Sequence, residues 1–128
     1  MAPELSLLVW SVILAFVQML IAVQGSLMQV GLLTLVGNRE KFPEMEDWAG
    51  RAMRAHLNML ENMALFVPLV LIAVVANKTN STTLLGAQIF LWARVAHGVV
   101  YLIGIKWLRT TIWVVSLIGL IMICSQLF

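Results

Sequence analysis

The chain has 128 residues, of which 62% are hydrophobic and only 11% are charged, with a formal net charge of +2 and a mean hydropathy of +0.98. Soluble domains carry about 25% charged residues, so this composition excludes an ordinary soluble domain, a disordered chain and a nucleic-acid-binding protein. The single cysteine, Cys124, excludes a disulfide framework and a cysteine-ligated metal site. The composition predicts an integral membrane protein.

The apolar residues fall into four segments, each long enough to cross a bilayer as a helix, which takes about 20 residues. The predicted helices cover approximately residues 5–36, 48–76, 84–105 and 108–128. The apolar runs are continuous and do not alternate with polar residues, which favours helices over the strands of a closed barrel. The sequence therefore predicts an all-α, up-down transmembrane bundle of four helices that forms one domain over residues 1–128.

The basic residues predict how the bundle is oriented. In a four-span chain the first and third connections lie on the same side, and here they carry Arg39, Lys41, Lys106 and Arg109. The second connection, on the other side, carries only Lys78. Because Lys and Arg collect on the cytoplasmic side of membrane proteins, we expect the first and third connections to be cytoplasmic and both termini to lie outside.

The second predicted helix carries a polar stripe. Arg51, Arg54, Asn58 and Glu61 are separated by three, four and three residues. This spacing places them within roughly 80° of arc on one helix face, so they form a single stripe about three turns long. His56 lies off the stripe and is expected to have another partner, in the first helix or on a backbone carbonyl.

The third predicted helix carries a second stripe, formed by Arg94, His97 and Tyr101 at helical spacing, and Arg109 opens the fourth helix. A charged side chain at the centre of a membrane helix costs about 2.5–3.5 kcal/mol on insertion scales. These side chains are therefore expected to face other helices or a wet cavity instead of lipid.

Two interpretations of the stripes remain open. In the structural one, the stripes hold the helices together, with Glu61 paired with Arg54 or Arg94 and Asn58 bridging between helices. In the functional one, the three stripe arginines and Arg109 outnumber their single acid, and an anionic ligand balances them, because an unpaired buried charge is strongly destabilising. Arginine binds carboxylates and phosphates with two parallel hydrogen bonds, so these are the groups expected on such a ligand.

The same residues resemble the MAPEG family, the membrane-associated proteins of eicosanoid and glutathione metabolism. The resemblance rests on RAMRAHLNMLEN at residues 51–62, RVAHGVVY at 94–101 and LRT at 108–110. The short connections resemble those of bacterial members similar to microsomal glutathione transferases. The resemblance therefore implies an inner-membrane location.

The resemblance also implies a homotrimer of four-helix subunits that binds glutathione as a co-substrate between neighbouring subunits, near the cytosolic face and without a metal. Carried over residue by residue, it places Arg109 beside the glutathione sulfur, as the catalytic residue, with Thr110 adjacent. The implied glutathione-binding residues are Arg51, Arg54, Asn58, Glu61, His97, Tyr101 and Thr110, with Arg94 and His56 as the supporting network.

The activity that this arrangement implies is a glutathione transferase or peroxidase. Arg109 would stabilise the glutathione thiolate, which then attacks a lipophilic electrophile or a lipid hydroperoxide arriving from membrane lipid, a detoxification reaction. One alternative is a non-catalytic lipid-binding scaffold of the same family. Another is a small multidrug/proton antiporter, which would need an isolated deep carboxylate, whereas Glu61 is expected to be crowded by arginines.

Overall fold

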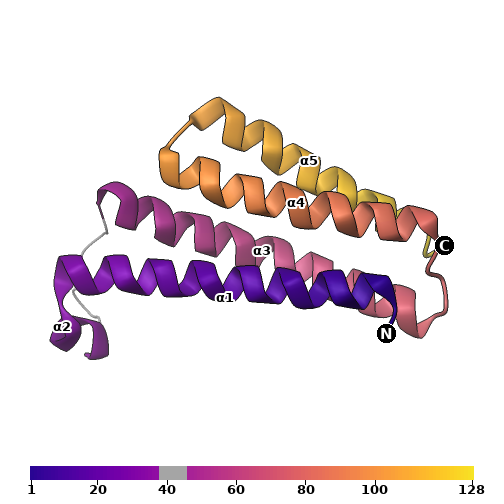
Figure 1. The fold of residues 1–128 in the computed structure, drawn as a ribbon, viewed down its shortest axis with the longest axis horizontal. Helices are drawn as coiled ribbons and strands as arrows, with labels where there is room; N and C mark the ends of the chain where they lie inside the picture. The colour runs from indigo at the N-terminus through magenta and orange to yellow at the C-terminus, as the bar shows by residue number, and fades with distance from the viewer. Residues whose placement is uncertain (38–45) are drawn as a thin grey trace.

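The computed structural model describes residues 1–37 and 46–128, so the predictions for Arg39 and Lys41 lie outside the described residues. The described residues form helices and no strands. In chain order the helices are α1 (Pro3–Val30), α2 (Leu32–Val36), α3 (Asp47–Val75), α4 (Ser81–Ile103) and α5 (Lys106–Ser125) (Figure 1).

All the long helices, α1, α3, α4 and α5, are long and apolar enough to cross a membrane. Even the shortest, α5, has 20 residues, about 30 Å at 1.5 Å per residue, which matches the hydrocarbon thickness of a bilayer. The predicted fold class, an all-α membrane bundle of four spanning helices, is confirmed.

The first apolar segment, predicted as one helix over residues 5–36, is two helices in the structure. It breaks at Gly31, whose φ of 82° and ψ of 165° are far from helical values. Glycine adopts positive φ at little cost because it has no Cβ. The amide of Gly31 still bonds to the carbonyl of Leu27 at 3.1 Å, which closes the last turn of α1 before the chain turns into α2.

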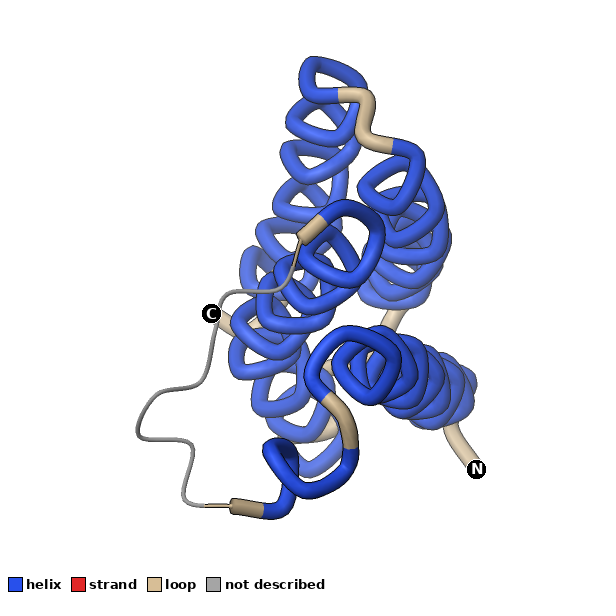
Figure 2. The backbone as a smooth tube through the Cα atoms, turned by 90° about the vertical axis from the view of Figure 1, so that its left-hand side faces the viewer, coloured by secondary structure: helices blue, strands red, loops and turns tan. Residues whose placement is uncertain are grey.

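The long helices pack as two pairs, α1 with α3 and α4 with α5, and α4 also contacts α1 and α3 (Figures 1 and 2). Glycine permits the closest approach within the second pair. A Cβ on Gly119 would lie 2.6 Å from the carbonyl oxygen of Gly86, and a Cβ on Gly86 would lie 2.7 Å from that of Gly119. The two backbones touch, as small residues allow in membrane helix pairs.

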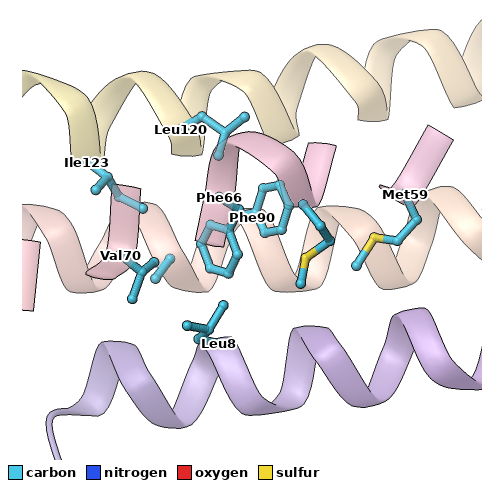
Figure 3. Close-up of a cluster of buried hydrophobic side chains, with 9 residues drawn as sticks. Leu8, Met59, Phe66, Val70, Phe90, Leu120 and Ile123 are labelled. Carbon is cyan, nitrogen blue, oxygen red and sulfur yellow. The ribbon is translucent and has the colours of Figure 1, made fainter. Parts of the chain in front are cut away.

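The apolar core occupies the end of the bundle nearer the two chain termini. Phe66 of α3 and Phe90 of α4 stack with their ring centroids 4.0 Å apart, and Leu8, Leu120 and Ile123 surround them from α1 and α5 (Figure 3). Aromatic pairs of this kind contribute beyond the area that they bury. The two polar stripes lie toward the other end, where α3 and α5 begin and α4 ends.

Candidate functional site

Arg94 of α4 lies at the centre of the polar end of the bundle. Its side chain is 0% exposed, and its Nη2 donates a hydrogen bond of 2.7 Å to Oδ1 of Asn58 on α3. Asn62 supports this arrangement, because its Nδ2 donates to the backbone carbonyl of Asn58 at 3.0 Å. Nε and Nη1 of Arg94 are buried without a hydrogen-bond partner among the described residues. The guanidinium therefore retains unused donors.

His97, one turn after Arg94, extends the cluster. Its ring is 2% exposed, and its Nδ1 lies 3.3 Å from Nη2 of Arg94. Because arginine nitrogens can only donate, Nδ1 of His97 is the acceptor in this pair, which puts the proton of a neutral ring on Nε2. The two buried side chains thereby fix each other's orientation.

Tyr101 links this cluster to α5. The ring centroids of His97 and Tyr101 are 5.5 Å apart, and the guanidinium carbon of Arg109 lies 4.4 Å from the centroid of the Tyr101 ring. A cation at this distance over an aromatic face is attracted by the ring quadrupole. Arg109 is therefore held at the start of α5 by an uncharged partner, and this contact does not neutralise its charge.

The remaining stripe residues of α3 lie at the edge of the cluster. Arg51 is half-buried, and its Nε donates to the backbone carbonyl of Leu102 on α4 at 2.9 Å. Arg54 and Glu61 are exposed on the surface of the single chain. The structural interpretation pairs Glu61 with Arg54 or Arg94, and the second of these pairings is wrong: the guanidinium of Arg94 bonds to Asn58 and contacts His97. The expected role of Asn58 as a bridge between helices is confirmed.

Two predicted residues stand apart from the cluster. Thr110 is exposed, and its hydroxyl donates to the backbone carbonyl of Lys106 on its own helix at 3.2 Å. His56 is half-buried with its Nδ1 buried and unpartnered among the described residues, so the partner expected for it is absent there. Of the predicted site residues in the part of the chain that the structure describes, side-chain contacts join five to one another: Asn58, Arg94, His97, Tyr101 and Arg109.

Several buried polar residues were not assigned a role from the sequence, and Gln18 is one of them. Gln18 of α1 is 7% exposed, and both polar atoms of its amide are buried without a partner among the described residues. The available signal was its place in the middle of an otherwise apolar helix, where an unpaired amide is costly.

The cluster can bind an acidic ligand through its guanidinium groups. Arg54 is exposed, two nitrogens of Arg94 have no partner in the described part of the chain, and Arg109 lies over the ring of Tyr101. Guanidinium groups in partly dehydrated surroundings are suited to bind carboxylates bidentately. Within the part of the chain that the structure describes, no group of three or more His, Cys, Asp and Glu side chains could hold a metal ion.

Comparison with known proteins gives one family and a set of partial relatives. The model of the MAPEG family matches residues 7–128. Microsomal glutathione S-transferase 1 of Mus musculus and that of Rattus norvegicus are each 37% identical to this chain over 65 residues, and that of Homo sapiens is 35% identical over the same length. The matched part is 51% of this chain and 42% of each relative. No solved structure gives a significant match.

Proposed function

The chain belongs to the MAPEG family, and from that premise we propose that it is a membrane-bound glutathione transferase that acts on lipophilic electrophiles. The observation that carries the proposal is the set of uncompensated guanidinium groups at one end of the bundle, above all Arg94 with its two unpartnered nitrogens and Arg109 over Tyr101. The likeness to microsomal glutathione S-transferase 1 over half of the chain supports it.

Glutathione supplies the charges that this end of the bundle lacks, because it carries two carboxylates and one ammonium group. We assign the carboxylates to Arg51 and Arg54, and the ammonium group to Glu61, with Asn58 as a neutral hydrogen-bonding partner. Arg51 and Asn58 are already held by contacts to α4, so they need little reordering when the ligand binds. Such pre-organisation lowers the entropic cost of binding.

Arg109 is the residue proposed to activate the thiol. A free cysteine thiol has a pKa of about 8.5, so most glutathione is protonated at neutral pH. A guanidinium beside the sulfur favours the thiolate, and a shift of two pKa units requires about 2.7 kcal/mol, which a single well-placed cation in a water-poor site can supply. His97 and Tyr101 line the same site and hold Arg109 in place through the ring contact.

The proposed reaction is a substitution at carbon. The thiolate sulfur forms a bond to the electrophilic carbon, and the leaving group departs with its electron pair. With a lipid hydroperoxide the thiolate would attack the terminal oxygen instead and break the O–O bond, and the lipid alkoxide would leave and take up a proton to become the alcohol. A second glutathione would then reduce the resulting sulfenic acid to the disulfide with release of water. A lipophilic acceptor dissolves in the bilayer and reaches such a site from there, which explains why the enzyme would be located in a membrane.

We also propose that the active form is a homotrimer with the site between subunits. Arg54 and Glu61 are exposed on a helix that is otherwise apolar enough to lie in a membrane. Charged side chains facing lipid are costly, so a neighbouring subunit that covers them, with glutathione between, removes that cost. The orientation predicted from Lys106 and Arg109 would place this site near the cytoplasmic face.

The test is a conjugation assay with the full chain in lipid vesicles. Glutathione and a lipophilic aryl chloride are added, and the thioether and released chloride are measured together. We expect both products in equal amounts and only with the protein present, with a further arm in which cumene hydroperoxide yields glutathione disulfide if the peroxidase reaction also occurs. Binding of glutathione without product would favour the scaffold, and proton-coupled drug flux without product would favour the antiporter.

A further inference from the structure

A second pocket lies within one chain, between α1, α3 and α4. Its cavity has a volume of about 170 Å³, and apolar residues line it except for Gln18. An apolar cavity of about 150 Å³ is large enough to hold benzene. The lining includes Leu14 of α1, Ala52 and Ala55 of α3, and Val95 and Gly98 of α4. None of these residues belongs to the proposed glutathione site.

Gln18 is the one residue with a polar side chain among those that line this cavity. Its side chain is 93% buried, as the complement of its 7% exposure, and neither Nε2 nor Oε1 has a partner among the described residues. Each unmet buried donor or acceptor costs about 1–3 kcal/mol, so the amide is expected to have an occupant of the cavity as its partner.

Gly98 makes room for this amide. A Cβ at Gly98 would lie 2.5 Å from Nε2 of Gln18, closer than real Cβ atoms approach other heavy atoms. The Gln18 amide can therefore pack against α4 at residue 98 only because that residue is glycine.

An apolar groove along α1 and α4 shares part of its lining with the cavity. Leu14, Val17 and Val95 line both spaces, and the groove of about 520 Å³ also carries Trp10 and Trp92, which are largely exposed on the single chain. An occupant can therefore place a polar group at Gln18 and extend an apolar body toward lipid.

We propose that this cavity binds one uncharged lipophilic alcohol, with its hydroxyl group at Gln18 and its hydrocarbon chain along the groove between α1 and α4. A hydroxyl both donates and accepts, so it matches Oε1 and Nε2 at once. A charged head group is disfavoured because the lining contains no ionic partner. Water alone is a poor occupant, since buried water needs two to four polar partners and only Gln18 is present.

The test uses decan-1-ol that carries a photoreactive diazirine in its chain, added to the full protein in lipid vesicles. We expect saturable labelling of α1 and α4, with the labelled residues located by mass spectrometry. Unlabelled decan-1-ol should compete with the probe and reduce the labelling, whereas decane, which has the same chain length and no hydroxyl, should not. If decane competed with the probe as strongly as decan-1-ol, or if the labelling never saturated, the proposal would be overturned.

Substitutions locate the hydroxyl. Gln18→Leu removes both hydrogen-bonding atoms at similar size, and Gly98→Ala displaces the amide, so each should weaken saturable labelling about tenfold, the effect of roughly 1.4 kcal/mol. Gln24→Leu makes the same chemical change at an exposed position of α1 and should leave labelling unchanged. Undiminished affinity in folded Gln18→Leu would contradict the assignment. The binding readout needs neither glutathione nor turnover, so its failure leaves the transferase proposal standing.

Discussion

Nη2 of Arg94 on α4 donates a 2.7 Å hydrogen bond to Oδ1 of Asn58 on α3, although 36 residues separate them in the chain. The guanidinium is fully buried, and this is its shortest contact to another side chain among the described residues. A neutral amide and the neighbouring His97 ring thus position a buried cation without cancelling its charge, which leaves the cation able to interact with an anion.

Removing that amide should destabilise the fold. Hydrogen bonds to charged groups contribute about 1.5–3 kcal/mol, so we expect Asn58→Leu to lower the free energy of unfolding by about 2 kcal/mol. Arg94→Met should cost less when Asn58 is already leucine, and the coupling in the double-mutant cycle should fall in the range of about 0.5–3 kcal/mol. Denaturant titration in detergent measures all three variants. Additive effects would show that the hydrogen bond contributes nothing to stability, and Gln88→Leu, at an exposed position of α4, serves as the control.

The positions of Arg94, His97 and Tyr101 on one face of α4 could be predicted from the sequence, because helical periodicity fixes which side chains share a face. Their partner on α3 could not. Asn58 and Glu61 lie on the same stripe one turn apart, and only the packing of α3 against α4 decides which of them meets Arg94. Periodicity sets the face of a helix but not its register against a neighbour.

The same limit applies to Gln18 and Gly31. Gln18 was recognisable as a polar interruption of an apolar helix, but the cavity at its amide depends on Gly98, 80 residues later in the chain. The break at Gly31 depends on a positive φ, which glycine permits but does not require. Apolar segments long enough to span a bilayer were predictable, because composition and length alone define them.

The glycine contact between α4 and α5 should be sensitive to a single methyl group. A Cβ on Gly119 would lie 2.6 Å from the backbone oxygen of Gly86, which no side-chain rotation can relieve. We expect Gly119→Ala to separate the two helices and to lower the free energy of unfolding by about 1–3 kcal/mol, the usual cost of overpacking. Thermal melting followed by circular dichroism measures this loss.

Gly37→Ala is the matched control for that substitution. The φ of Gly37 is −72°, and the nearest atom of the described residues to an added Cβ would be the carbonyl oxygen of Leu33, at 3.5 Å. An unchanged melting temperature in both variants would show that α4 and α5 do not pack backbone to backbone.

Arg54→Ala should weaken glutathione binding with little effect on the fold, because Arg54 is exposed on the single chain. Glutathione at 100 times its Kd stabilises a folded protein by about 2.7 kcal/mol, and a variant that binds about tenfold more weakly should lose about half of that stabilisation. The measurement is the shift in melting temperature with added glutathione. Lys78→Ala, at an exposed position in the other end of the bundle, should retain the full shift. If glutathione raised the melting temperature of Arg54→Ala as much as that of the parent protein, Arg54 would not be part of the glutathione site.

Replacing Arg109 tests whether a guanidinium at the start of α5 stabilises the glutathione thiolate. The measurement is the ultraviolet absorbance of thiolate when glutathione is added to the parent protein and to Arg109→Ala at a series of pH values. We expect bound thiolate in the parent at neutral pH, and in the variant only as the pH approaches the ordinary thiol pKa of about 8.5. Identical thiolate titrations in the two proteins, with glutathione bound to both, would contradict this expectation.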